Sequence, residues 1–221
     1  MIVRGGNTYP AMVHLDASVS LRCPACRQVG TFDRIIFSNQ PILTDVSITA
    51  GGVSVISGLR FCPNLACRAL LFFVWDRNRA GLAVTYPPER LDFDSTNIPA
   101  SITKALEEAI TCHANECFIA AAIMVRKTLE ELCHVRTATG TNLKERIRNL
   151  GASILLPKEL LDGLDDLRLL GNDAAHIESL EFNTVGRDEV EIGIEFAKEV
   201  LKAVYQYSDL LAKLRALKRN P

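Results

Sequence analysis

The chain lacks any apolar run long enough to cross a bilayer. Its two longest apolar stretches lie near residues 69–75 and 117–125, well short of the roughly 20 residues that a transmembrane helix needs. The opening Met-Ile-Val-Arg-Gly-Gly also lacks the basic and apolar regions of a signal peptide. We therefore expect a soluble, cytoplasmic protein with no membrane partner.

The sequence also lacks an excess of basic residues. The net charge is −1, and residues 1–95 contain nine arginines, no lysine and seven acidic residues. Residues 96–221 contain sixteen basic and nineteen acidic residues. Neither half has the bulk charge of a nucleic-acid binder. Contact with RNA or DNA would need a local patch, and it should weaken quickly as salt rises.

Several catalytic motifs are missing as well. The chain has no phosphate-cradling glycine loop, no His-Glu-x-x-His motif, no nucleophile elbow and no dinucleotide fingerprint. These absences remove support for the common enzyme classes.

Four of the seven cysteines form two closely spaced pairs, Cys23-Pro-Ala-Cys26 and Cys62-Pro-Asn-Leu-Ala-Cys67. Cytoplasmic thiols stay reduced, so metal binding or buried thiols are favoured over disulfides. Two tight turns that each bring two thiolates to one ion can close a tetrahedral four-sulfur zinc site. We expect a structural Zn²⁺ ion on Cys23, Cys26, Cys62 and Cys67, because a site without an open position supports a fold and performs no chemistry. The alternative is a set of reduced surface or core thiols.

The composition changes between Tyr86 and Pro99. Before this segment, short β-prone runs alternate with turn signals, which is typical of a small antiparallel sheet. After it, the pattern becomes helical. We expect an α+β protein, with a zinc-ribbon-like β domain over residues 1–90 and an all-α bundle over residues 91–221. The β-prone runs are residues 32–37, 46–48, 53–56, 70–75 and 82–86.

Four or five helices are predicted in the second domain. They span about residues 99–114, 115–135, 141–151, 157–170 and 187–219. Asn115 is a plausible N-cap for the second helix, and Pro157 is well placed to start the fourth. Short connections favour antiparallel neighbours and hence a compact bundle. The basic residues near the end of the chain are expected to form a solvated face. They are Lys213, Arg215, Lys218 and Arg219.

Arginines and aromatic residues surround both cysteine pairs. One interpretation is a surface that contacts phosphates and stacks on bases. The other, which we favour, is that the arginines solvate the small domain and the aromatic side chains fill its core. The residues are Arg22, Arg27, Arg60, Arg68, Phe61, Phe72, Phe73 and Trp75.

The stretch Leu167–His176 places a cation, an amide and an imidazole among apolar residues. Arg168, Asn172 and His176 are spaced i, i+4 and i+8, so they share one face of a continuous helix. Arg168 and His176 would then lie about 12 Å apart along the axis. Direct contact needs a break at Gly171-Asn172 or a second chain. Alternatively, Gly171 permits a close helix approach or a bend, Asn172 caps the next segment, and His176 ties a loop to the bundle.

Arg126 and Glu130 are spaced i, i+4 on the second predicted helix. We favour a partly buried ion pair that orders the bundle over a direct catalytic role. The pair could still support a site by orienting Arg168 or His176.

The C-terminal part, about residues 86–221, resembles the bacterial family DUF4145, which is grouped with the HEPN-like helical bundles. The matching segments are residues 102–110, 120–132, 143–150 and 167–176, the last ending in Gly-Asn-x-Ala-Ala-His. Relatives occur alone, behind zinc ribbons, or appended to restriction-type enzymes, so the resemblance implies genome defence. Active HEPN proteins are metal-independent endoribonucleases in which two protomers usually form one site, with Arg and His separated by four to six residues. Here seven residues separate Arg168 from His176.

The resemblance implies a site at Arg168, Asn172 and His176. His176 would act as acid or base at the ribose 2′-hydroxyl, Arg168 would stabilise phosphorane-like charge, and Asn172 would orient the imidazole. Our leading hypothesis is a homodimeric, nucleic-acid-associated accessory of a bacterial defence or toxin system. It would act as a candidate ribonuclease on RNA or DNA and contact a protein partner of that system. The competing hypothesis is a noncatalytic module in which the bundle dimerises or recruits a partner and the ribbon recognises it.

Overall fold

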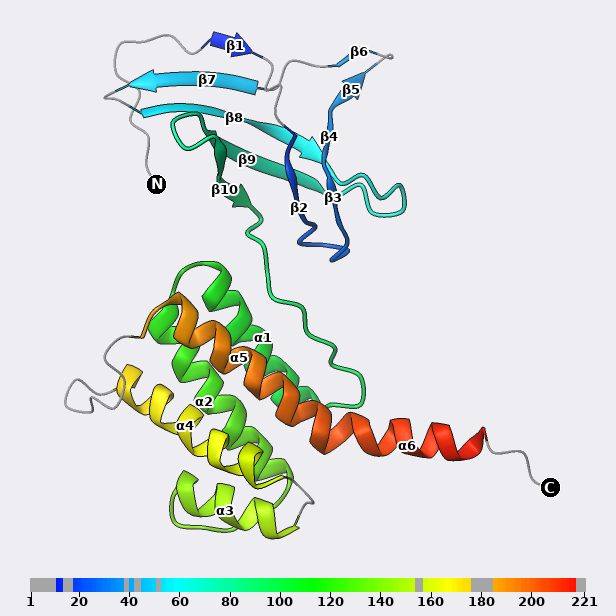
Figure 1. Ribbon diagram of the computed structural model, residues 1–221, viewed down its shortest axis with the longest axis vertical. Coiled ribbons are helices and arrows are strands. Elements are labelled where there is room, and N and C mark those ends of the chain that lie inside the picture. The colour runs from blue at the N-terminus through cyan, green and yellow to red at the C-terminus, as the bar shows by residue number, and fades with distance from the viewer. Residues whose placement is uncertain are drawn as a thin grey trace. The chain divides into compact units, whose positions relative to one another are not determined.

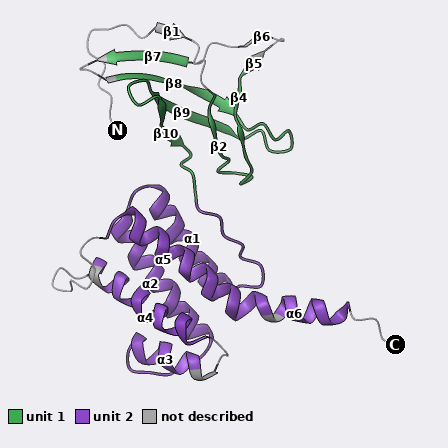
Figure 2. Cartoon of the chain, in the orientation of Figure 1, with its two compact units in different colours: residues 1–90 green, residues 91–221 purple. Residues whose placement is uncertain are grey.

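The computed structural model describes residues 11–13, 18–37, 40–41, 45–50, 53–153, 157–175 and 185–217. The chain divides into two compact units, residues 1–90 and 91–221 (Figure 2). Antiparallel strands make up the first unit and helices make up the second (Figure 1). The predicted α+β class is confirmed.

One antiparallel sheet forms most of the first unit. Its strand order is β1 (Ala11–Val13), β7 (Asp45–Ala50), β8 (Val53–Phe61), β9 (Leu70–Asp76) and β10 (Gly81–Tyr86), and β4 (Asp33–Arg34) pairs with the end of β8. Two small hairpins accompany the sheet, β2 (Ser20–Arg22) with β3 (Val29–Thr31) and β5 (Ile36–Phe37) with β6 (Gln40–Pro41). The β2–β3 hairpin carries the first cysteine pair, and our sequence analysis did not predict it.

Side chains along β9 alternate between two environments. Leu71 and Phe73 are buried, whereas Leu70 and Phe72 are exposed. This period of two is that of a strand with one face on a core. The buried core of the unit consists of Val19, Leu21, Cys23, Phe32, Ile56, Cys62, Leu71 and Phe73. Two cysteines of the predicted metal site therefore belong to the core itself.

A buried ion pair links β7 to β8. Nη1 and Nη2 of Arg60 each donate to a carboxylate oxygen of Asp45 at 2.7 Å, and both side chains are 3% exposed. The guanidinium also lies 4.5 Å from the centre of the Phe73 ring. Gly58 leaves room for this arrangement, because a Cβ there would collide with the Asp45 carboxylate. The expectation that Arg60 solvates the small domain or contacts phosphate is therefore wrong.

The second unit is a bundle in which α2 packs against α1, α3, α4 and α5 (Figure 1). Its helices are α1 (Ala100–Ala114), α2 (Phe118–Val135), α3 (Leu143–Ser153), α4 (Lys158–Ala175), α5 (Arg187–Leu201), the π-helical turn η1 (Lys202–Gln206) and α6 (Tyr207–Ala216). Within the described residues, no helix combines the length and the apolar character that a membrane span requires.

Two predicted helix boundaries are wrong, and one predicted helix contains an unpredicted π turn. Asn115 is the C-cap of α1, and Cys117 is the N-cap of α2. The predicted final helix is interrupted by the π turn η1. Helix α4 continues past Leu170 to Ala175.

Gly171 serves packing against α2 and does not break α4. A Cβ at this position would collide with Cβ of Arg126 and lie 3.0 Å from the carbonyl oxygen of Ala122, both on α2. The glycine thus serves a close approach of two helices, which was one of the two alternatives for it.

Candidate functional site

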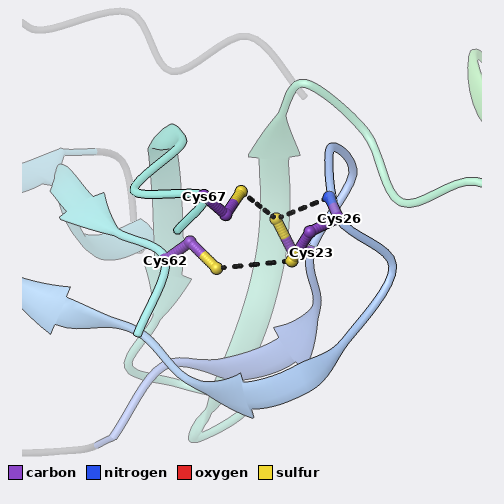
Figure 3. Close-up of side chains that lie close together, drawn as sticks. All are labelled: Cys23, Cys26, Cys62 and Cys67. Atoms are coloured by element: carbon purple, nitrogen blue, oxygen red, sulfur yellow. Dashed lines mark hydrogen bonds between the residues drawn. The ribbon is translucent and has the colours of Figure 1, made fainter. Parts of the chain in front are cut away.

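The two cysteine pairs lie in two loops of the first unit. Cys23 and Cys26 occupy the turn between β2 and β3, and Cys62 and Cys67 occupy the loop between β8 and β9. The Sγ atoms of Cys23 and Cys67 are 3.9 Å apart, and those of Cys26 and Cys62 are 3.7 Å apart. All four Sγ atoms lie within 4.8 Å of one another, and Figure 3 shows them facing a common centre. The predicted cysteine cluster is confirmed.

The sulfur spacing fits a tetrahedral metal ion. Four sulfurs at about 2.3 Å from a central ion would lie roughly 3.8 Å from one another. Two of the six separations, 3.7 and 3.9 Å, match this value, and the other four are no longer than 4.8 Å. Four protein sulfurs would fill all four positions, so the arrangement can hold an ion but leaves no position for a substrate.

Both loops close by the same backbone pattern despite their different lengths. The amide of Cys23 donates to the carbonyl of Gln28, and the amide of Cys62 donates to the carbonyl of Ala69, each at 2.9 Å. The residue after the second cysteine adopts a left-handed conformation in each loop, with φ of 64° at Arg27 and 45° at Arg68. This tight turn folds the second sulfur of each pair back towards the first.

The cluster is electrostatically suited to a cation. A hydrogen bond from the backbone amide of Gln28 lowers the pKa of Cys26 to about 7. Burial raises the pKa of Cys62 to about 12. Thiolates packed this closely repel one another, and burial penalises each negative charge. A divalent cation at the centre would offset both costs.

The other three cysteines lie in the helical unit. Cys133 is buried in the bundle core, where burial raises its pKa to about 11. Cys112 is half-buried, and burial raises its pKa as well. Cys117 is exposed. In the part of the chain that the structure describes, none of them joins a metal-binding group.

The arginines around the cysteine loops have intramolecular partners. Arg22 donates to the carbonyl of Arg27 at 3.0 Å. Arg68 pairs with Asp33 at 3.1 Å and lies over the Phe61 ring. With Arg60 and Phe73 buried as well, the proposed phosphate-contacting and stacking surface loses several of its members.

In the helical unit, the guanidinium of Arg168 is held by a carboxylate. Its Nε donates to Oδ1 of Asp165, one turn back on α4, at 2.6 Å. Lys144 of α3 approaches the other carboxylate oxygen at 3.5 Å. The hydrogen bond from Arg168 is the main reason that the pKa of Asp165 lies below its usual range. Asp165 also lines a cavity of about 440 Å³ between α3 and α4.

Arg126, which forms an ion pair with Glu130, lies beside Arg168. Nη1 of Arg126 donates to the backbone carbonyl of Arg168 at 3.3 Å, and its Nε lies 3.5 Å from Oε1 of Glu130. The structure therefore brings Arg126 of α2 to the backbone of Arg168, and Glu130 pairs with the Arg126 side chain. Asn172 lies one turn further along α4 and is half-buried.

His176 lies outside the described residues. Helix α4 runs unbroken through Gly171 and Asn172 to Ala175, so the helix break that would have joined Arg168 to His176 is not found. Asp165 was not predicted as the partner of Arg168. Its i, i+3 spacing from Arg168 was the available signal.

Comparison with known proteins gives one match. The family described as "Domain of unknown function (DUF4145)" matches residues 107–220. No curated protein and no solved structure matches the chain. The match covers α2 to α6 and slightly more than half of the sequence. The chain therefore belongs to the DUF4145 family.

Proposed function

We propose that the protein is a noncatalytic, homodimeric interaction module, made of a zinc-stabilised β unit and a helical bundle that pairs with a second copy. The salt bridge between Arg168 and Asp165, at 2.6 Å, is the observation that carries the noncatalytic part. An RNA phosphate would have to displace this carboxylate and would be repelled by it. A guanidinium already neutralised in this way is poorly prepared to stabilise transition-state charge.

Zinc is the ion that best suits the cysteine cluster. Four thiolates in a tetrahedral arrangement favour Zn²⁺, which needs no open position and undergoes no redox change. A reducing compartment such as the cytoplasm suits this centre, because free thiols persist there. When bound, the ion would cross-link the β2–β3 hairpin to β8 and β9 and would supply no catalysis.

The test of this function combines oligomeric state with nucleic-acid binding. We expect the zinc-loaded protein to sediment as a dimer and to bind RNA and DNA only weakly at physiological salt. Tight binding of RNA, lost in Arg168→Ala, would contradict the proposal. If the protein is a dimer that binds RNA only weakly, the dimer would serve as bait in a search for a protein partner from a defence system.

A second candidate function is metal-independent RNA cleavage within a bacterial defence or toxin system, in a HEPN-like bundle. The observation that favours it is the hydrogen bond from Arg126, itself paired with Glu130, to the backbone carbonyl of Arg168. His176 of the same copy or of a second one would supply the acid or base, and Asn172 would orient it.

Incubation of RNA with zinc-loaded protein in magnesium-free buffer separates the two candidates. Cleavage that disappears in both His176→Ala and Arg168→Ala would establish the enzyme and overturn the noncatalytic proposal. Asp165→Asn would then raise the rate, because it releases the Arg168 guanidinium. Equal, background-level cleavage by the parent and the variants supports the module.

A further inference from the structure

Helix α6 carries an exposed apolar stripe. Its members are spaced i, i+3, i+4, i+7 and i+10, which places them on one face of the helix. They are Tyr207, Leu210, Leu211, Leu214 and Leu217, and they are 50–78% exposed. Isolated exposed apolar side chains are ordinary, but a contiguous stripe of this size marks an interaction surface.

The direction of α6 is set by contacts at its base. Nε2 of Gln206 donates to the carbonyls of Asp94 and Thr96 at 2.9 and 3.1 Å. Nδ2 of Asn97 donates to Asp209 at 3.1 Å. The helix therefore projects beyond α1 to α5, as Figure 1 shows, and does not fold back over them. The π turn η1, a rare element that often marks functional positions, lies directly before it.

A groove of complementary character runs along the outer face of α5. Ile192, 70% exposed, and Phe196 supply its apolar part. Four carboxylates border these two side chains, at Asp188, Glu191, Glu195 and Glu199. The cavity has a volume of about 750 Å³. The groove thus combines a short apolar strip with an acidic edge, in which Glu195 and Glu199 are paired with Lys198 and Lys202.

The stripe on α6 matches this groove in charge and in length. Lys213 and Arg215 lie on either side of Leu214, each about 100° around the helix axis, so two cations flank the stripe. Helix α6 has ten residues, or about 15 Å. The groove from Asp188 to Glu199 has about the same length. Complementary charges of this kind fix the register and orientation of an interface.

We infer that α6 of one copy docks along the α5 groove of a second copy, and that the second copy's α6 docks in return, in an antiparallel homodimer. The inference rests on the proposed function, because it assigns the surface of the proposed dimer. In this pairing Leu214 lies opposite Ile192 and Leu210 lies opposite Phe196. Ala203 then lies near the twofold axis, where a small side chain allows close approach of the two helices.

A second copy fits the groove better than the chain's own α6. Helices α5, η1 and α6 follow one another without a gap over residues 187–216, so α6 cannot reach its own α5 unless this long helix breaks. Two antiparallel copies cover the apolar stripes of both α6 helices at once, and such a self-complementary interface closes as a dimer. Six exposed large apolar side chains from each copy would leave water, namely the five of the stripe and Ile192, and the half-buried Phe196 would be covered further.

Existing ion pairs must be exchanged on both surfaces for the docking to form. Lys213 is paired with Asp209 at 2.7 Å, and the two side chains are 69% and 39% exposed. On α5, Glu195 is paired with Lys198 at 2.7 Å. Pairs within one helix contribute little to stability. In the register given above, Lys213 lies near Glu195 of the second copy, so the exchange of these two pairs would cost little.

The test measures the dimer dissociation constant of the zinc-loaded full chain by analytical ultracentrifugation. Leu214→Glu should weaken the dimer by about 100-fold or more, because it buries an unpaired charge. Ile192→Glu should weaken it by a similar factor. Ala212→Glu is the matched control: residue 212 lies opposite Leu214 on the same helix, and this variant should stay dimeric. Unchanged helical circular dichroism in each variant excludes unfolding as the cause.

A mixture of the two variants gives a sharper test. Each variant alone lacks a working contact, but a mixed dimer retains one, between α6 of Ile192→Glu and α5 of Leu214→Glu. Recovery of dimers on mixing supports the reciprocal exchange. A monomeric Leu214→Glu beside a dimeric Ile192→Glu would overturn the docking on α5. Dimers in both single variants would overturn the surface while leaving the proposed function intact, whereas a monomeric parent at all concentrations would overturn the proposed function itself.

Discussion

The two units of this chain are stabilised in different ways. Among the described residues of the β unit, eight form a buried core cluster, and two of these are cysteines of the four-cysteine cluster. The helical unit has a larger apolar core, drawn mainly from α1 to α5. A small core offsets little of the conformational entropy lost on folding. The β unit therefore depends on two local cross-links, the cysteine cluster and the Asp45–Arg60 pair, whereas the bundle depends mainly on the packing of its apolar core.

Each unit has its own spectroscopic signal, so the comparison can be tested in the intact chain. Trp75 is the only tryptophan, and it lies on β9 against the core of the β unit. Its fluorescence reports on that unit. Far-ultraviolet circular dichroism reports mainly on the helices.

The largest effect is expected from loss of one cysteine ligand. In small zinc domains the ion contributes about 10–16 kcal/mol to folding, more than a core of this size can replace. Cys62→Ser should give the Trp75 fluorescence of an unfolded β unit, while the helical signal persists. The control is Cys117→Ser, an exposed cysteine outside the cluster, which should leave both signals unchanged. Native-like Trp75 fluorescence in Cys62→Ser would show that the β unit does not depend on the cysteine cluster for its fold.

The second effect comes from the buried ion pair. Asp45→Ala leaves the Arg60 guanidinium buried without a counter-charge, which should destabilise the β unit by about 3–5 kcal/mol. Urea unfolding followed by Trp75 fluorescence measures this change. Asp33→Ala removes an exposed Asp–Arg pair in the same unit and should cost less than about 1 kcal/mol. Equal costs for the two variants would show that burial of the Asp45–Arg60 pair has no special weight.

A smaller effect is expected at the close approach of α2 and α4. Gly171→Ala gains up to about 1 kcal/mol of helix propensity. The new Cβ meets Arg126 and Ala122, and overpacking typically costs about 1–3 kcal/mol. The helical unit should lose stability in urea, and the Trp75 transition should not move. A stabilised helical unit would mean that α2 and α4 can separate at no cost.

The smallest effect is a pH dependence of the helical unit. His113 is buried at the end of α1, and burial lowers its pKa below the ordinary value of 6.5. Glu191, 3.6 Å away, opposes this shift, and Arg187 adds to it. Below pH 6.5 the unfolded chain binds the proton before the folded chain does. The unit should therefore lose stability as the pH falls below 6.5 and show no such loss above it.

Urea midpoints in the parent and in His113→Gln measure this slope. The slope below pH 6.5 should flatten in His113→Gln but persist in His134→Gln, which changes an exposed histidine. An identical slope in the parent and in His113→Gln would assign the pH dependence to other groups.

The sequence predicted those features that depend on local patterns. The four-cysteine cluster followed from two short spacings and is confirmed. The β-prone run over residues 70–75 and the helix predicted over residues 115–135 likewise lie close to β9 and α2. The first hairpin was missed because its strands have only three residues each.

Features that depend on distant parts of the chain were not predictable. Arg60 belongs to the core only because β7 places Asp45 against it, fifteen residues away in sequence. Gly171 was a candidate helix break until the position of α2 showed that it serves close packing. Lys213 and Arg215 of α6 were expected to belong to a solvated face. In the proposed dimer they flank the exposed leucines of the same helix instead.

Metal removal from the intact chain shows whether the cysteine cluster holds the β unit together. We expect one zinc ion per chain by elemental analysis. We also expect that a chelator unfolds the β unit, as seen by Trp75, while the helical signal is retained, and that added zinc restores the β unit. A chain that binds no metal, or two units that unfold together when the metal is removed, would contradict this expectation.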